Sequence, residues 1–362
     1  MEIKEYKCPN CSGAVSFDSS TQNMKCPYCD AEFKIESLIE YQKEMAAPEK
    51  DSFEVDISKA GSAWGDEDLG DLSTGNCPSC GAELIGDKNT IATVCPCCGN
   101  TQIVQQRVAG LLKPNFVLPF QLEKKAAVEA LKKFYQGKKL LPDLFKEENR
   151  VNSIQGLYVP FWLFDAKSQG HMSFKATRTS GWSDSRYNYT KTDVYSVVRE
   201  GSLSFEKVPV DGSDKMNDDY MDSIEPFDYS KLKGFLTAYL SGYIAEKYDV
   251  SVDASKDRAI RRIKNSLESQ FTKSVQGYST VTKERSTVNI EEGKVSYSLF
   301  PVWVLNTKYK KENYQFIMNG QSGLLSGKLP VDKGKAAKYQ FLFTACIGTF
   351  ITVIIQLLRI FL

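Results

Sequence analysis

The chain has 362 residues and a formal net charge of +1, and 42% of its residues are hydrophobic. That is enough chain for two or three domains with packed cores. Two function classes are disfavoured. His171 is the single histidine and is interpreted as a strand-surface residue, which argues against catalysis by a histidine-based triad. No G-x-x-x-x-G-K-[ST] phosphate loop occurs, which argues against nucleotide-driven activity.

Eight of the ten cysteines form one pattern that is written twice. Each copy has two C-x-x-C knuckles separated by fourteen residues. Such spacing supplies four thiolates to one ion, as in closed structural Zn²⁺ sites, and its exact repetition favours metal over disulfides or scattered buried cysteines. The predicted ligands are Cys8, Cys11, Cys26 and Cys29 for one zinc ion and Cys77, Cys80, Cys95 and Cys98 for a second.

Cys97 is a spare thiol inside the last knuckle, and we interpret it as a bystander because Cys95 and Cys98 keep the two-residue spacing. Four cysteine ligands leave no position for substrate, so we expect structural rather than catalytic centres. Unoxidised cysteines indicate a reducing compartment, and the first residues carry no apolar run, so we expect no signal peptide. The knuckles are followed by small or turn-forming residues, as a tight chain reversal requires: Ser12, Asp30, Gly81 and Gly99.

The N-terminal part is predicted to contain two small zinc ribbons, at residues 1–36 and 77–106, joined by an acidic flexible linker at 37–76. In the first ribbon, 14–18 and 24–25 are expected to form a hairpin, and metal binding should be coupled to its folding. A short helix is expected at 37–45. The second ribbon is expected to have strands at 84–85 and 90–94.

Trp64 stands in the polar linker between Ala63 and Gly65. Two interpretations stay open for its large side chain. It packs back on a ribbon or on the next domain, or it forms part of a short docking motif for a protein partner. We therefore retain Trp64 as a candidate partner-binding residue.

Residues 107–330 are predicted to form an α+β domain, with several strands and three helices. One helix is expected at 122–136, and a second begins at Asp228 and carries an apolar stripe from Leu232 to Ile244. A third, at 254–275, has a basic face that could meet anionic lipid or nucleic acid, or remain solvated. The expected strands are at 157–165, 171–177, 193–210, 278–290, 295–308 and 314–318.

A short β repeat lies inside this domain. The segment 158–165 matches 299–306, so that Pro160 aligns with Pro301 and Trp162 with Trp303. A proline inside a strand points to an edge or a bulge. The repeat suggests two related β units placed symmetrically, in which the tryptophans belong to the core rather than to a ligand platform.

Residues 341–362 are apolar over a length that spans a bilayer, about 33 Å as a helix. We predict a single transmembrane helix here, against the alternative of a helix buried in a soluble core. The basic juxtamembrane segment 331–340 places the N-terminal side in the cytoplasm, so we expect a single-pass protein of the inner membrane. Candidate membrane-anchor residues are Lys333, Lys335 and Lys338 before the helix, Gly348 on a face of small and polar residues that permits a partner helix, and Arg359, which can reach the outer headgroups.

The stretches 77–84, 90–99, 119–120, 158–162 and 319–323 together resemble a bacterial family of "TFIIB-type zinc ribbon-containing" membrane proteins, some of which carry a primosomal-helicase label. The resemblance covers most of the chain. It implies association with phage-shock-type and SPFH-type membrane proteins. The missing phosphate loop argues against the helicase label.

Charge decides between the candidate functions. Residues 1–110 hold 9 basic and 18 acidic side chains, whereas the remainder holds 37 and 27. Acidic ribbons repel phosphates, so nucleic acid is disfavoured as a partner. We therefore favour a non-enzymatic adaptor that is held at the membrane by its tail and binds another membrane-associated protein. The alternatives are a membrane-tethered zinc ribbon that binds nucleic acid and an enzyme with an unrecognised site in 107–330.

Overall fold

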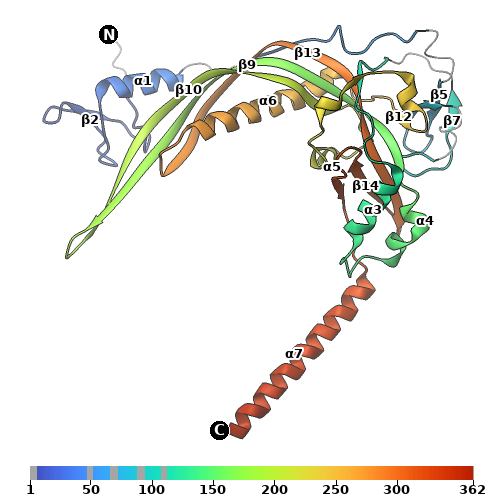
Figure 1. Cartoon of the computed structure of the whole chain (residues 1–362). Coiled ribbons are helices and arrows are strands. Elements are labelled where there is room, and N and C mark those ends of the chain that lie inside the picture. The colour runs from blue at the N-terminus through green and yellow to red at the C-terminus, as the bar shows by residue number, and fades with distance from the viewer. Residues whose placement is uncertain (1–5, 47–51, 66–71, 88–93, 107–111, 362) are drawn as a thin grey trace. The chain divides into compact units, whose positions relative to one another are not determined.

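A computed structural model of the chain describes residues 6–46, 52–65, 72–87, 94–106 and 112–361. They divide into two compact units (Figure 1). The first unit comprises Met1–Asp56, Asp165–Val208 and Arg258–Gly293, and the second comprises Ile57–Phe164, Pro209–Asp257 and Lys294–Leu362. The units interleave along the chain because three long strands contribute residues to both: β9 (Gln155–Ser183), β10 (Asn188–Asp211) and β13 (Thr280–Tyr309).

The first unit begins with the predicted first ribbon. Its three antiparallel strands are β1 (Ser16–Asp18), β2 (Asn23–Lys25) and β3 (Glu32–Phe33). Helix α1 (Ile35–Ala46) follows at once and confirms the helix expected at 37–45. The ribbon buries Cys8, Cys26 and, from α1, Leu38, which is little apolar surface for a folded unit.

The rest of the first unit is formed by the long strands, by β4 (Ser52–Asp56), which pairs with β13, and by helix α6 (Val252–Ser274). Helix α6 confirms the helix expected at 254–275. Its apolar side packs against the strands, where Ile263 and Leu267 join Met172 and Phe174 in one core. Gly170 permits the close approach of the helix, because a Cβ there would lie 2.2 Å from Leu267 Cδ2.

The second unit is a sheet in the order β11-β8-β13-β9-β12-β6-β5-β7, to which β14 and β15 add beside β13. Its further strands are β5 (Leu72–Asn76), β6 (Glu83–Asp87), β7 (Val104–Gln106), β8 (Phe116–Val117), β11 (Lys233–Gly234), β12 (Ile244–Glu246), β14 (Glu312–Asn319) and β15 (Leu325–Gly327).

The helices of the second unit are short, apart from the last. Helix α3 (Lys124–Tyr135) confirms the helix expected at 122–136, and it buries Ala127, Val128 and Leu131 against a core that contains Trp303. The others are η1 (Asp143–Lys146), α4 (Glu148–Val151), α5 (Asp218–Ser223), η2 (Tyr229–Lys231), η3 (Thr237–Leu240) and the long C-terminal α7 (Lys333–Phe361).

The helix expected from Asp228 to Ile244 is wrong. Asp228 does cap a helix, η2, but the chain then forms β11, η3 and β12. Gly234 and Gly242, which has φ +77°, are poor helix formers, and β11 and β12 complete the sheet beside β8 and β9. Tertiary pairing overrides the 3.6-residue apolar period.

The domain boundaries in the structure differ from the sequence-based ones. The predicted linker 37–76 contains most of α1 and all of β4 and β5, and both strands are paired in the sheet. The second ribbon belongs to the same unit as 294–362 rather than standing apart. Strand β6 of the ribbon pairs with β12, Ala245 opposite Ile85 and Glu246 opposite Leu84. Most of the strand expected at 90–94 lies outside the described residues.

The short repeat reappears as a structural correspondence. Strand β9 pairs in parallel with β12 at Tyr158 and Ala245, and β13 pairs in parallel with β8 at the aligned position, Leu299 and Val117. The carbonyl of Pro160 accepts a hydrogen bond from Gly212 N at 2.8 Å, and that of Pro301 accepts one from Gly320 N at 2.9 Å. Both glycines directly follow the strand that pairs with their repeat, β10 or β14.

The repeated tryptophans are core residues, as expected. Trp162 is 1% exposed and donates from Nε1 to Val250 O at 2.9 Å, and Trp303 is 3% exposed and donates to Leu122 O at 3.2 Å. The rings of Phe161 and Phe300, one from each copy but at different positions of the repeat, stack at 4.3 Å between centroids. Neither β9 nor β13 ends the strand order, so of the two alternatives for Pro160 and Pro301 the edge strand is wrong and the bulge stays a prediction.

We predict that Gly320→Ala destabilises the protein more than Gly212→Ala. A Cβ at Gly320 would lie 2.8 Å from the rigid Cβ of Pro301, whereas one at Gly212 would lie 3.5 Å from Pro160 Cβ. Overpacking of this kind costs about 1–3 kcal/mol. Denaturant midpoints of the purified variants measure the difference.

Gly234→Ala is the matched control for this comparison. It is also a sheet glycine, but no atom lies within 4 Å of its Cβ position, so its midpoint should stay close to that of the wild type. Equal midpoints for the Gly320 and Gly234 variants would contradict the packing argument.

Candidate metal centres

The eight predicted ligands converge in two groups of four sulfur atoms. In each group all ligand atoms lie within 4.8 Å of one another. In the first, Cys8 Sγ lies 3.6 Å from Cys29 Sγ and Cys11 Sγ lies 3.4 Å from Cys26 Sγ. A tetrahedral zinc site with Zn–S bonds of about 2.3 Å has sulfurs about 3.8 Å apart, so the geometry fits the ion.

The second group has the same arrangement. Cys77 Sγ lies 3.6 Å from Cys98 Sγ, and Cys80 Sγ lies 3.7 Å from Cys95 Sγ. All ten cysteines are free of disulfides, as the spacing indicated. The group contains Cys98 and not Cys97, which agrees with the interpretation of Cys97 as a bystander.

One backbone turn is used four times to bring the sulfurs together. In every knuckle the first cysteine donates its N–H five residues ahead and accepts from the residue after the second cysteine, for example Cys77 N to Ala82 O at 2.9 Å and Gly81 N to Cys77 O at 2.8 Å. The residue after each knuckle has a positive φ: 61° at Ser12, 54° at Asp30, 75° at Gly81 and 76° at Gly99. This is the physical reason for the small or turn-forming residues noted in the sequence.

Cys80 and Cys95 of the second group oppose one another's ionisation. A hydrogen bond from the Cys97 thiol is the largest influence on Cys95 and lowers its pKa to about 5, in spite of burial. Burial, followed by the charge of Cys95, raises the pKa of Cys80. A divalent ion removes this conflict by stabilising all four thiolates, which is why donor sets of this kind hold metal.

Glu246 is a buried neighbour that sequence reasoning missed. It is 1% exposed, and burial raises its pKa to about 8, so at neutral pH it is mostly uncharged. Its carboxyl accepts from Ser213 Oγ at 2.9 Å and also contacts the Cys97 side chain. A neutral Glu246 avoids a further negative charge beside the second group. No local motif marks it, because β12 is brought to β6 only by sheet pairing.

The second ribbon is bound into its unit by side chains as well as by the sheet. Asn306 donates from Nδ2 to Pro96 O, and Gln315 donates from Nε2 to Cys97 O at 3.1 Å. Cys77 and Cys95 are fully buried in a core shared with Leu84 and strands β9 and β13. The second centre is therefore part of the core of its unit.

Trp64 belongs to the second unit and packs within it. Its ring meets Phe235 edge-on, with 5.8 Å between centroids, and the indole is partly buried. This contact is the packing alternative of the sequence-based interpretation. The indole Nε1 is buried without a hydrogen-bond acceptor among the described residues.

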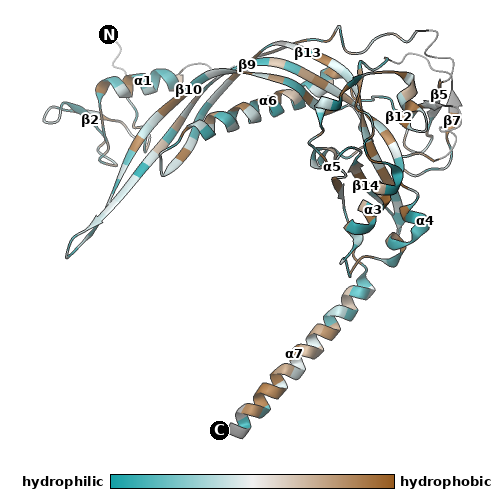
Figure 2. Ribbon diagram, in the orientation of Figure 1, coloured by the Kyte–Doolittle hydropathy of each residue, from teal (hydrophilic) through white to brown (hydrophobic). Residues whose placement is uncertain are grey.

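Helix α7 contains the predicted membrane segment. One helix of the described chain is long and apolar enough to cross a membrane, Lys333–Leu357, with mean hydropathy 1.8, and none of it is buried (Figure 2). Phe341, Phe343 and Phe350 are each more than two-thirds exposed. Gly348 and Arg359 lie on this helix, and no atom lies within 4 Å of a Cβ built at Gly348.

The start of α7 is fixed to the second unit. Asp332 caps the helix by accepting from Gly334 N at 2.8 Å, and its own N–H donates to Leu140 O at 2.8 Å. Lys335 Nζ forms an ion pair with Asp143 and donates to Leu141 O at 2.9 Å. Of the three candidate anchor lysines, Lys333 and Lys338 are exposed and Lys335 is engaged by protein.

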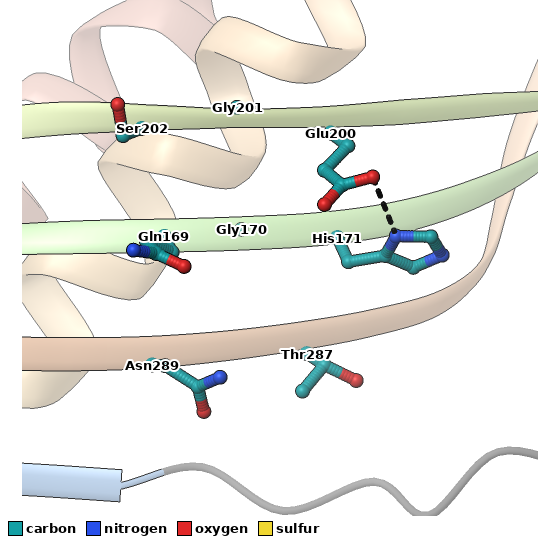
Figure 3. A pocket seen from close by; sticks show the side chains of 8 residues that line it. All are labelled: Gln169, Gly170, His171, Glu200, Gly201, Ser202, Thr287 and Asn289. Atoms are coloured by element: carbon teal, nitrogen blue, oxygen red, sulfur yellow. Dashed lines mark ion pairs between the residues drawn. The ribbon is translucent and has the colours of Figure 1, made fainter.

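His171 lies in a polar pocket of about 320 Å³ on the first unit (Figure 3). Its Nδ1 lies 3.8 Å from Glu200 Oε2, and its Nε2 contacts Glu44 of α1. The side chains in Figure 3 come from β9, β10 and β13. The expectation of a strand-surface histidine is thus accurate for its place, but the carboxylate neighbours could not be read from the sequence. The pocket is lined by Gln169, Gly170, His171, Glu200, Gly201, Ser202, Thr287 and Asn289.

Comparison with known proteins yields one informative similarity. The chain is 35% identical over 337 residues to the uncharacterized protein YdjG of Bacillus subtilis strain 168, an alignment that covers 93% of each chain. No protein-family model and no solved structure matches the chain.

We predict that the two metal centres contribute unequally to stability. Cys77→Ser should remove one of two zinc ions and lower the main thermal transition, because Cys77 belongs to a shared core. Cys8→Ser should also remove one ion but leave that transition nearly unchanged, because the first ribbon has few buried apolar residues. Zinc content by elemental analysis and a thermal unfolding curve measure both effects.

Cys346→Ser is the control, since this exposed cysteine lies on α7 and should leave both ions and the transition in place. Equal shifts for the Cys8 and Cys77 variants would contradict the asymmetry. Two retained ions in either variant would contradict the ligand assignment itself.

Proposed function

The chain belongs to the family of the Bacillus subtilis protein YdjG, and on that premise we propose that it is a non-enzymatic adaptor anchored at the cytoplasmic face of the inner membrane. In this proposal both Cys₄ groups hold structural zinc, helix α7 crosses the bilayer once, and the body binds a membrane-associated protein. The observation that carries it is the combination of closed cysteine sites with a long, uncovered apolar helix in one chain.

The metal sites support a scaffold rather than a catalyst. A catalytic zinc site keeps one coordination position for water or substrate, whereas each group here offers four sulfur ligands. The knuckle turns and the buried cysteines give these sulfurs a fixed geometry. Structural zinc centres of this kind give rigidity to small modules that have little apolar core.

Helix α7 supports the membrane location by its exposure. Large aromatic and aliphatic side chains on all sides of an unpacked helix are unfavourable in water and favourable in hydrocarbon. Lys333 and Lys338 precede the apolar part, and a positive flank favours the cytoplasmic side. The face of α7 that carries Gly348 would permit a partner helix to approach closely.

The bacterial zinc-ribbon family that the sequence resembles supports the kind of partner. That resemblance implies association with phage-shock-type or SPFH-type membrane proteins, and we extend it to this chain as part of the proposal. Trp64 remains a candidate contact, although its ring already packs on Phe235. A partner could bind there only beside this contact or in place of it.

Nucleic-acid binding is the second candidate, and the basic face of α6 is what would favour it. Most charges on this face are engaged: Lys256 Nζ lies 2.6 Å from Asp253 Oδ1, and Arg258, Arg262 and Lys264 also have interaction partners, whereas Arg261 is exposed. The acidic ribbons add repulsion. These observations favour the adaptor over the nucleic-acid reader.

Deleting residues 341–362 should release the protein from membranes. The deletion removes the apolar helix and leaves the Asp332 and Lys335 contacts to the second unit intact. Fractionation of cells, followed by alkaline extraction of the membranes, measures the release. If the truncated chain still sedimented with extracted membranes, the anchor would have to lie elsewhere.

The full-length protein in detergent should bind a protein from native membranes and should not bind DNA or RNA at low salt. Chemical crosslinking in membranes followed by affinity isolation tests the first expectation, and a fluorescence-anisotropy titration with single- and double-stranded oligonucleotides tests the second. Binding that weakens steeply with added salt would favour the nucleic-acid candidate, because counterion release produces that dependence.

A further inference from the structure

The joined end of β9 and β10 is a two-stranded hairpin whose side chains are all exposed from Arg178 to Thr192. Closer to the core, β9 buries Met172, Phe174 and Ala176. At its base Arg178 and Thr179 bond to Gly277 and Ser279, but for the hairpin beyond them no packing contact with another described element is recorded. An isolated two-stranded hairpin of this kind is only marginally stable in water. We therefore expect the end of this hairpin to be stabilised by contact with another surface.

The hairpin end is nevertheless well defined by its own contacts. Asp184 Oδ1 accepts from the backbone N–H groups of Arg186 and Tyr187 at 2.8 Å each, and its Oδ2 accepts from Tyr189 Oη at 2.9 Å. The two backbone bonds lead the influences that hold the pKa of Asp184 below its usual range. Internal bonds thus occupy the one carboxylate of the turn.

These contacts present a cluster of three aromatic rings, Trp182, Tyr187 and Tyr189. The rings of Trp182 and Tyr189 stack at 5.5 Å between centroids and 12° between planes, and Tyr187 meets Tyr189 at 6.2 Å. Their exposed fractions are 54% for Trp182, 64% for Tyr187 and 39% for Tyr189. Rings held open to solvent in this way are costly unless they meet a surface.

The side chains of this cluster indicate the kind of surface that it contacts. Each ring carries a polar group, the indole N–H or a phenol O–H, and the hairpin end from 178 to 192 contains no aliphatic or Phe side chain. Trp and Tyr are the residues enriched at the headgroup level of bilayers, because one end of the side chain is apolar and the other is polar and hydrated. Arg186 adds an exposed positive charge that anionic headgroups would attract.

We propose that the hairpin end formed by Trp182, Arg186, Tyr187 and Tyr189 inserts into the headgroup region of an anionic bilayer, as a membrane contact separate from α7. This inference rests on the proposed membrane anchoring. The hairpin would contribute a shallow, reversible contact, whereas α7 supplies the permanent anchor. The first unit would then have a membrane contact of its own.

The full-length protein in vesicles that contain phosphatidylglycerol provides the test, with phospholipids brominated near the headgroup as quenchers of tryptophan emission. Helix α7 contains no tryptophan, and Trp162 and Trp303 are buried. Quenching should therefore come mainly from Trp182. It should be largely lost in Trp182→Phe and retained in Trp64→Phe, which is the matched control.

Other outcomes would overturn the inference. If the protein floats with vesicles but Trp182→Phe is quenched as strongly as the wild type, the hairpin does not reach the lipid, and the anchoring stands. If the protein does not float, the anchoring fails and the inference fails with it. A photocrosslinker at Tyr187 that captures a protein rather than lipid in native membranes would assign the cluster to a protein partner instead.

Discussion

The crowding of four ionisable sulfurs within 4.8 Å of one another is the constraint on which this structure most depends. Without a cation, the ionised Cys95 opposes ionisation of Cys80, and burial makes the conflict worse. With a divalent ion, the same crowding becomes a crosslink between two distant knuckles. In the second unit this crosslink would lie inside a hydrophobic core, because Cys77 and Cys95 are part of that core.

The neighbours of the second centre show how a core tolerates so much charge. Glu246 is held neutral by burial, and the Cys97 thiol donates toward Cys95. Asn306 and Gln315 satisfy the carbonyls of the last knuckle. Cys97 is thus a bystander only in the sense that it is not among the four clustered sulfurs. Its hydrogen bond affects the electrostatics of a predicted ligand.

The sequence predicted local features well and non-local ones poorly, for a physical reason. Knuckle spacing, the residues that follow each knuckle, and helices α1, α3 and α6 depend on neighbours within a few residues, and they can be read directly. Strand pairing depends on partners far along the chain. The same apolar period that identifies α6 misleads between Leu232 and Ile244, where β11 and β12 exist only because β8 and β9 accept them. Neither Glu246 nor the hairpin end carries a local motif.

The repeat explains why the two units cannot be separated in sequence. Each copy places a proline and a tryptophan at the same register of a parallel pair, and each continues into a long strand, β9 or β13. Because those strands extend into the first unit, the chain must leave and re-enter the second unit to complete both copies. The ribbon that pairs with β12 and the helix that Asp332 caps both belong to the second unit. The second Cys₄ group in the core and the start of the long apolar helix are therefore parts of one folded body.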